Sequence, residues 1–129
     1  MKRTEIVLTG RIPSKKNSKV IVCRGKRPFL IPNSKFTAWH KDASFQLLTY
    51  GLKQLENIHI VELNFWMPDN RGADLTNKAE SVMDLLVDNH IIEDDKWQVI
   101  PCILLSCEGV DKDNPRVSIV IKQKGKKNG

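Results

Sequence analysis

Hydrophobic positions along the chain alternate with polar ones in some segments and recur every third or fourth residue in others. Alternating or β-branched apolar runs predict strands at residues 5–9, 20–23, 28–31, 58–67, 97–107 and 116–122. Apolar residues at helical spacing predict one helix from Phe36 to Tyr50 and a second over residues 74–89. The order β-ββ-α-β-α-β-β predicts an α+β fold with one mixed, mainly antiparallel sheet and two helices.

Turn residues predict how these elements connect. Arg24-Gly25-Lys26-Arg27 joins two short strands, which predicts a hairpin with a basic tip. Pro101 predicts a bend within 97–107, and the turn-rich residues 109–115 predict that 97–107 and 116–122 pair as an antiparallel hairpin. Residues 1–122 are expected to form a single domain, and residues 123–129 a basic, disordered tail.

The helix predicted over residues 74–89 divides into two faces. Its apolar face carries Leu75, Ala79, Val82, Met83 and Leu86. The opposite side is expected to carry Asp74, Asn77, Lys78, Ser81, Asp84 and Asp88. Thr76, Glu80 and Asp84 form a row at i, i+4 and i+8, where a bound cation would offset the repulsion between the acids. Asp74 also suits a purely structural role as the N-cap of this helix.

Charge is distributed unevenly along the 129 residues, whose net charge is +6. Residues 1–41 hold eleven Lys or Arg and a single acid, Glu5, whereas residues 67–99 hold eight acids and three basic residues. A metal-dependent enzyme acting on a polyanion has this distribution, because carboxylates hold cations while Lys and Arg hold phosphates. The alternative is that the acids and the basic runs are solvated surface.

Several classes of protein are excluded by what the sequence lacks. No apolar run is long enough to span a membrane, and the N-terminus does not have the pattern of a signal peptide. The sequence contains no GxxxxGK[ST] loop, so no nucleotide cofactor is expected. Three cysteines without a CxxC pair predict reduced thiols in a cytoplasmic protein, and the three histidines lack metal-ligand spacing. An EF-hand does not fit, because Arg71 and Ala73 stand where its calcium loop needs ligands.

A second acidic group, Asp94-Asp95, follows the predicted helix. The strand 58–67, the helix and the return turn could bring this pair back beside the end of that strand. Carboxylates from two segments would then meet at one edge of the sheet. Such oxygen ligands suit Mg²⁺, with Mn²⁺ as a substitute, and these ions support phosphodiester hydrolysis.

The motifs of residues 67–99 resemble the RusA family of Holliday-junction resolvases of phages and prophages. The resemblance is carried by the MPD segment at Met67, the DLTN helix start at Asp74 and the IEDD turn ending at Asp95. The IPSKKNS segment, residues 12–18, resembles the family's loop near the first strand. The resemblance implies a RusA-like fold and a homodimer that cuts four-way DNA junctions by paired symmetric nicks with Mg²⁺. It also implies catalytic roles for Asp74 and Asp95.

Two positions depart from the family pattern. The family's best-known form has an Asp where this chain has Thr76, and a catalytic Lys where this chain has Glu80. We hypothesise that Glu80 replaces the missing metal ligand and that Lys78 supplies the cation near the scissile phosphate. Asp94 or Asp84 would assist the metal, and Asn77 would hold a ligand or phosphate. The alternative is that Glu80 faces solvent and the site runs on Asp74, Asp94 and Asp95.

Three functions follow in order of preference. The first is a Mg²⁺-dependent crossover junction endodeoxyribonuclease of recombination, repair or phage DNA processing, acting in the bacterial cytoplasm. Its expected phosphate contacts are Lys15, Lys16, Asn17, Lys19, Arg24, Lys26, Arg27 and Arg71. The second is a catalytically inactive, structure-selective DNA-binding protein of the same fold, which Thr76 favours. The third is an adaptor whose basic face binds acidic proteins.

Overall fold

The computed structural model describes residues 2–14, 19–24, 27–32 and 34–125, with the backbone alone for residues 19–24 and 27–32. Six strands and two helices follow one another in the order β1 (Lys2–Thr9), β2 (Lys19–Arg24), β3 (Arg27–Pro32), α1 (Ser34–Leu48), β4 (Ile58–Met67), α2 (Leu75–Asp88), β5 (Ile103–Val110) and β6 (Arg116–Gln123). This order confirms the predicted α+β class. Strand β4 has the bounds expected from its apolar run, which ends at Pro68.

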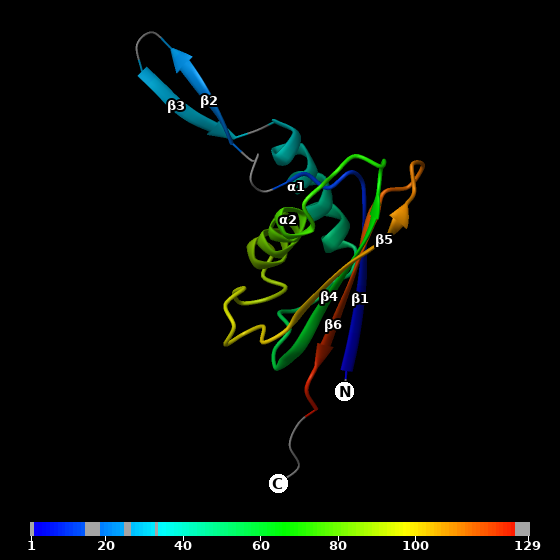
Figure 1. Cartoon of the computed structure of the whole chain (residues 1–129). Coiled ribbons are helices and arrows are strands. Elements are labelled where there is room, and N and C mark those ends of the chain that lie inside the picture. The colour runs from blue at the N-terminus through cyan, green and yellow to red at the C-terminus, as the bar shows by residue number, and fades with distance from the viewer. Residues whose placement is uncertain (1, 15–18, 25–26, 33, 126–129) are drawn as a thin grey trace.

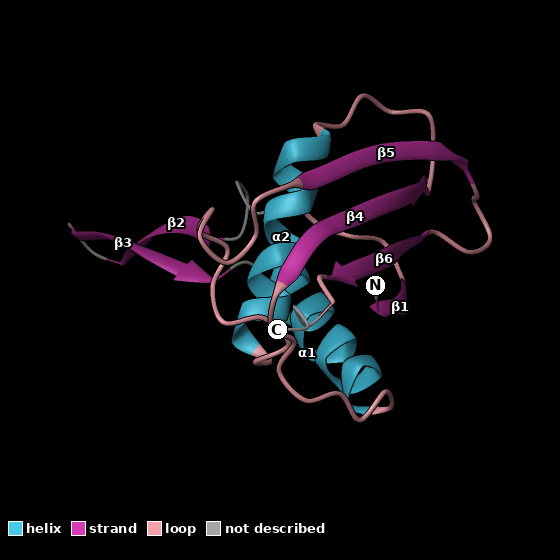
Figure 2. Cartoon of the chain, turned by 90° about the horizontal axis from the view of Figure 1, so that it is seen from below, coloured by secondary structure: helices cyan, strands magenta, loops and turns pink. Residues whose placement is uncertain are grey.

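Four strands form a mixed sheet in the order β1-β6-β4-β5 (Figures 1 and 2). β6 runs antiparallel to both β1 and β4, whereas β4 and β5 are parallel. The prediction of a mixed, mainly antiparallel sheet is confirmed. β2 and β3 pair only with each other, as the predicted hairpin, which extends away from the rest of the chain (Figure 1).

Both helices cover the same face of the sheet, and the core lies between (Figure 2). Alternate residues of the strands point into it, including Ile6, Leu63 and Ile119, all fully buried. From α1 the predicted apolar stripe supplies Trp39, Ala43 and Leu47, and α2 supplies Val82, Leu85 and Leu86. Ile91 and Ile92 extend the core beyond α2.

The predicted hairpin of the last two strands is wrong. β4 lies between β5 and β6, so that Leu63 faces Leu105 on one side and Ile119 on the other. The turn at residues 111–115 crosses the end of β4 instead, where Asp111 N donates to Met67 O at 2.8 Å. The antiparallel direction was predicted correctly, but the intervening strand was not.

The strand predicted to begin at residue 97 starts only at Ile103. Residues 97–99 form a turn, because the backbone N–H groups of Val99 and Ile100 both donate to Lys96 O at 2.9 Å. Ile100 anchors this turn in the core, while Trp97 is 74% exposed. The apolar residues within 97–100 therefore belong to a loop and not to a strand, and Ile100 fixes this loop to the core.

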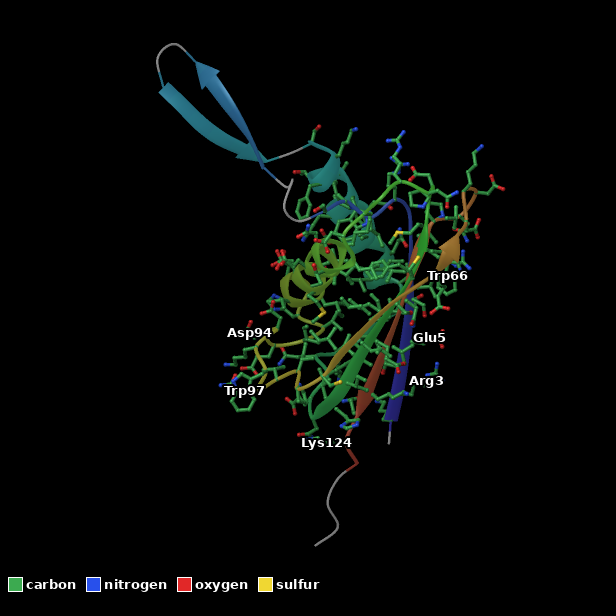
Figure 3. The ribbon with its side chains drawn as sticks, in the orientation of Figure 1. Arg3, Glu5, Trp66, Asp94, Trp97 and Lys124 are labelled. Carbon is green, nitrogen blue, oxygen red and sulfur yellow. The ribbon has the colours of Figure 1, made fainter. Side chains whose placement is uncertain are left out.

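The other face of the sheet carries a mixture of charged and aromatic side chains, including Arg3, Glu5 and Trp66 (Figure 3). The Arg116 guanidinium lies 4.1 Å from the centre of the Trp66 ring. At the end of β6, Gln123 is part of the strand and Lys124 N donates to Asn57 O at 2.7 Å. Residue 123, where the predicted tail starts, therefore belongs to β6, and residues 126–129 lie outside the described part.

No helix in the described part of the chain has the length and apolar character needed to cross a membrane.

Candidate active site

Asp74 is the N-cap of α2. Its backbone is extended (φ −87°, ψ 114°), and its Oδ1 accepts hydrogen bonds from Thr76 N at 3.0 Å and Thr76 Oγ1 at 2.6 Å. Asn77 Nδ2 donates to its other oxygen at 3.2 Å. The structural role predicted for Asp74 is therefore confirmed. Thr76, at the position of a family Asp, donates to the first carboxylate instead of adding a second.

An acidic pocket lies between α2 and β5. It has a volume of about 270 Å³ and is lined by Thr76, Ala79, Glu80, Met83, Asp95, Ile103 and Leu105. Glu80 and Asp95, fifteen positions apart in the sequence, thus face one hollow with an apolar floor. Both residues are exposed, so water and a substrate can reach their carboxylates.

The acidic pocket lies at a different part of the sheet from the one expected. Asp95 shares it with Ile103 and Leu105, which pair with Val61 and Leu63 in the first half of β4. The sequence placed the Asp94-Asp95 pair beside the other end of β4, at Met67. The chain instead returns to the start of β5, because the turn at residues 96–100 is anchored by Ile100.

The remaining candidate ligands are not gathered around the acidic pocket. Asp94 Oδ1 accepts a hydrogen bond from Asp95 N at 2.8 Å, within its own turn, and Asp94 does not line the pocket. Asp88 pairs with His40 Nε2 at 2.9 Å, which gives it a structural partner. Among the described residues, no three His, Cys, Asp or Glu side chains are grouped closely enough to hold a metal ion.

The donor chemistry of the acidic pocket nevertheless fits Mg²⁺. This ion is commonly bound by one or two carboxylates, with water and substrate phosphate supplying the other oxygens. Glu80 and Asp95 supply two carboxylates. Asp74, the N-cap of α2, does not line the pocket and is held by Thr76.

The other side of α2 packs against residues 12 and 13. Ser81 is fully buried, and its Oγ donates to Pro13 O at 2.6 Å. Lys78 Nζ donates to Ile12 O at 2.6 Å. Ser81, which helical spacing assigns to the side opposite the apolar face, is therefore buried, because a loop from another part of the chain covers it there.

A basic pocket opens beside this contact. Its volume is also about 270 Å³, and it is lined by Arg11, Ile12, Pro13, Lys35, Met67, Pro68, Asp69, Arg71, Ala73 and Lys78. Arg11 forms an ion pair of 2.7 Å with Asp69, and Arg71 Nε lies 3.9 Å from the same carboxylate. Four cations surround a single acid, so the pocket is suited to an anion.

The pKa of Lys78 is lowered in this pocket. Burial lowers the pKa of Lys78, the nearby charge of Arg11 lowers it further, and Asp69 partly offsets both effects. Lys78 lines the basic pocket and not the acidic one. The residue predicted to hold the scissile phosphate is thus on the side of α2 that faces away from Glu80.

Of the predicted phosphate contacts, Arg71 lines the basic pocket and is well exposed. Lys15, Lys16, Asn17 and Lys26 lie outside the described residues, as do the side chains of Lys19, Arg24 and Arg27. Sequence reasoning missed Arg11 and Lys35. Arg11 was counted among the basic residues near the N-terminus, but nothing local to the sequence brings it beside Asp69, 58 positions later.

The chain matches no protein-family model and no curated protein with which it was compared.

Proposed function

We propose that the protein is a metal-dependent endonuclease that cuts branched DNA, with four-way junctions as its substrate, as the resemblance to the RusA family implies. The observation that carries the proposal is the acidic pocket, where Glu80 and Asp95 converge from α2 and the turn before β5. Asp74, at the start of the same helix, does not line this pocket and is proposed as a ligand only because the resemblance implies it. The motifs that led to the RusA family contain both Asp74 and Asp95.

In the proposed reaction, Glu80 and Asp95 would hold the ion, and Asp74 would assist them. Bound Mg²⁺ would supply an activated water and stabilise the leaving oxygen. Thr76 keeps the Asp74 carboxylate in one orientation through its hydroxyl group.

The basic pocket would hold the DNA backbone next to the cut. Arg11, Arg71 and Lys78 present donors for phosphate oxygens, and Asp69 orients Arg11. Contacts of this kind give affinity that depends on salt and hardly on sequence. A homodimer would supply the two sites needed for symmetric nicks, in the bacterial cytoplasm, during recombination, repair or phage DNA processing.

A nicking assay on a synthetic four-way junction tests this proposal. The chain should nick the junction with Mg²⁺ or Mn²⁺ and not with EDTA, and Asp95→Asn should abolish nicking while the junction remains bound. Asp88→Asn, the same change at an acid of α2 that is paired with His40, serves as the control and should cut normally. Nicking by Asp95→Asn at the rate of the unmodified chain would refute the proposed site.

One observation favours a second function, that of an inactive, structure-selective DNA-binding protein. Thr76 occupies the position of a family carboxylate and donates to Asp74. Under this function the chain would bind the junction with the same affinity with and without Mg²⁺, and would leave it uncut. The same assay separates the two functions.

A further inference from the structure

The two edge strands of the four-stranded sheet differ in whether side chains bond their outer backbone groups. β5 forms one edge and β1 the other, and among the described residues neither has a second strand neighbour. The outer backbone groups of an edge strand are open to pairing unless side chains, charges or a covering segment occupy them. How each edge satisfies these groups therefore indicates which one is available to a partner.

The β1 edge is closed by side chains of α1 and the residues that follow it. The Tyr50 hydroxyl accepts a hydrogen bond from Val7 N at 2.9 Å and donates to Val7 O at 3.3 Å. Gln46 does the same at Thr9, accepting from Thr9 N at 2.9 Å and donating to Thr9 O at 3.1 Å. Charged residues, Lys2, Arg3 and Glu5, occupy the first half of the strand. Another strand cannot pair along this edge without displacing Tyr50 and Gln46.

The β5 edge leaves its backbone groups unoccupied. Cys102 O accepts from Val61 N at 3.0 Å, and Val61 stands opposite Ile103, so alternate residues from 102 onward face β4. Ile103, Leu105 and Cys107 consequently point their N–H and C=O groups away from the sheet. Within the described part of the chain, the one side-chain contact to the β5 backbone is Cys107 Sγ to Gly109 O at 3.7 Å, inside the strand itself.

The first half of β5 lacks the features that protect an edge, whereas the register with β4 shifts at Glu108 in the second half. Ile103 is 42% exposed, Leu104 49% and Val110 48%, and the first charged residue of the strand is Glu108. No Pro or Lys interrupts the strand. An exposed edge that begins with three apolar residues favours pairing with another strand over that half of β5.

We propose that β5 pairs antiparallel with β5 of a second copy of this chain, across a two-fold axis near Leu105. Self-pairing closes the sheet at two copies, because the remaining edges are both β1 edges sealed by Tyr50 and Gln46. An axis at Leu105 also keeps the two Glu108 side chains at opposite ends of the pairing, so like charges do not meet.

This inference deepens the proposed function, and the choice of a second copy as the occupant rests on it. The acidic pocket shares Ile103 and Leu105 with β5. Pairing through β5 would therefore place two acidic pockets on either side of one axis. A pair of related cutting sites is what symmetric nicking of a junction requires.

The test measures molar mass by size-exclusion chromatography with light scattering over a range of protein concentrations, without DNA or metal. The unmodified chain should be a dimer. Ile103→Pro removes an N–H that does not bond β4, and should weaken the dimer at least about tenfold, since the axis repeats the loss. Leu104→Lys places a cation beside Glu62 within the sheet and, across an axis at Leu105, diagonal to the same lysine of the second copy, so it should weaken the dimer less than Ile103→Pro does.

Leu48→Lys is the matched control, because Leu48 is 71% exposed on α1 and should leave the dimer intact. Should a β5 variant fail to fold, amide hydrogen exchange of the unmodified chain decides instead. The N–H groups of Ile103, Leu105 and Cys107 should be protected at high concentration and lose protection on dilution. An unmodified monomer, a dimer indifferent to both β5 changes, or unprotected outer amides would overturn the inference.

The nicking assay keeps this result distinct from the proposed function. A dimer through β5 that never nicks a junction would refute the nuclease and leave the pairing standing. A monomer that nicks would refute the pairing alone. A monomer that pairs β5 with a strand of another protein would also refute it, because a second copy is the occupant proposed.

Discussion

The polar residues on the two sides of α2 have different surroundings: an exposed pocket on one side and a packed loop on the other. On the β5 side, Glu80 is exposed and faces the acidic pocket with Asp95. On the other side, Lys78 and Ser81 are held by the carbonyl oxygens of Ile12 and Pro13. The comparison teaches that helical spacing assigns residues to faces, whereas the segments packed against each face decide what those residues do.

The largest expected effect is on the acidic side. Glu80→Gln removes a proposed metal ligand and should slow Mg²⁺-dependent nicking about a hundredfold or more, equivalent to about 3 kcal/mol of barrier. The rate of a single turnover on a four-way junction measures it. Glu93→Gln, the same change at an exposed acid of the following turn, should leave the rate unchanged.

A second change tests whether Glu80 compensates for Thr76. If it does, Thr76→Asp added to Glu80→Gln should restore much of the lost rate, because a carboxylate returns one helical turn away. Normal nicking by Glu80→Gln with normal metal affinity would show that the site runs on the aspartates and that no compensation is needed.

The acidic side also marks how far the sequence could lead. Asp74, Glu80 and Asp95 were predicted as ligands from the motifs and from the helical row, and the structure places Glu80 and Asp95, but not Asp74, at one pocket. The basic pocket could not be predicted from the sequence, because it forms only when residues 12 and 13 pack against α2, more than sixty positions later.

The same limit applies to the sheet. The bounds of β4 were predicted because its apolar run ends at a proline, but the neighbours of β5 and β6 are chosen by packing across the whole domain. Val99 and Ile100 have the alternation of a strand, yet both N–H groups turn back to Lys96 O. Local pattern cannot separate an apolar loop anchor from a strand residue.

The next largest effect is expected on the stability of the protein, from the side of α2 that packs against residues 12 and 13. Ser81→Ala leaves the carbonyl of Pro13 without its hydrogen bond in a buried place, and should lower the free energy of unfolding by about 1–2 kcal/mol. Urea denaturation measures this. Glu80→Gln should change stability by less than about 0.5 kcal/mol, since its side chain is exposed. If both Ser81→Ala and Glu80→Gln lower the stability, or if neither does, the two sides of α2 do not differ in packing as argued.

A smaller effect is expected on DNA affinity. Lys78→Met keeps the length and apolar stem of the side chain but removes the charge from the basic pocket. Junction binding in EDTA should weaken severalfold, and the slope of log K against log salt should fall by about one. Lys53→Met, at an exposed lysine of the segment between α1 and β4, should change neither. A loss of nicking rate without a change in affinity would instead place Lys78 at the scissile phosphate.

The smallest effect is metal binding without DNA, and it probes the acidic side alone. Mn²⁺ held by Glu80 and Asp95 should stabilise the folded chain in proportion to its occupancy, because binding to the native state raises its stability by mass action. At a concentration near ten times Kd the gain is about 1.4 kcal/mol, or roughly 3–6 °C in Tm for a domain of this size. Asp95→Asn and Glu80→Gln should each reduce the shift, whereas Ser81→Ala, although less stable, should show all of it. An equal Mn²⁺ shift in all four chains would mean that the ion binds elsewhere, and the two sides of α2 would then differ in packing and not in chemistry.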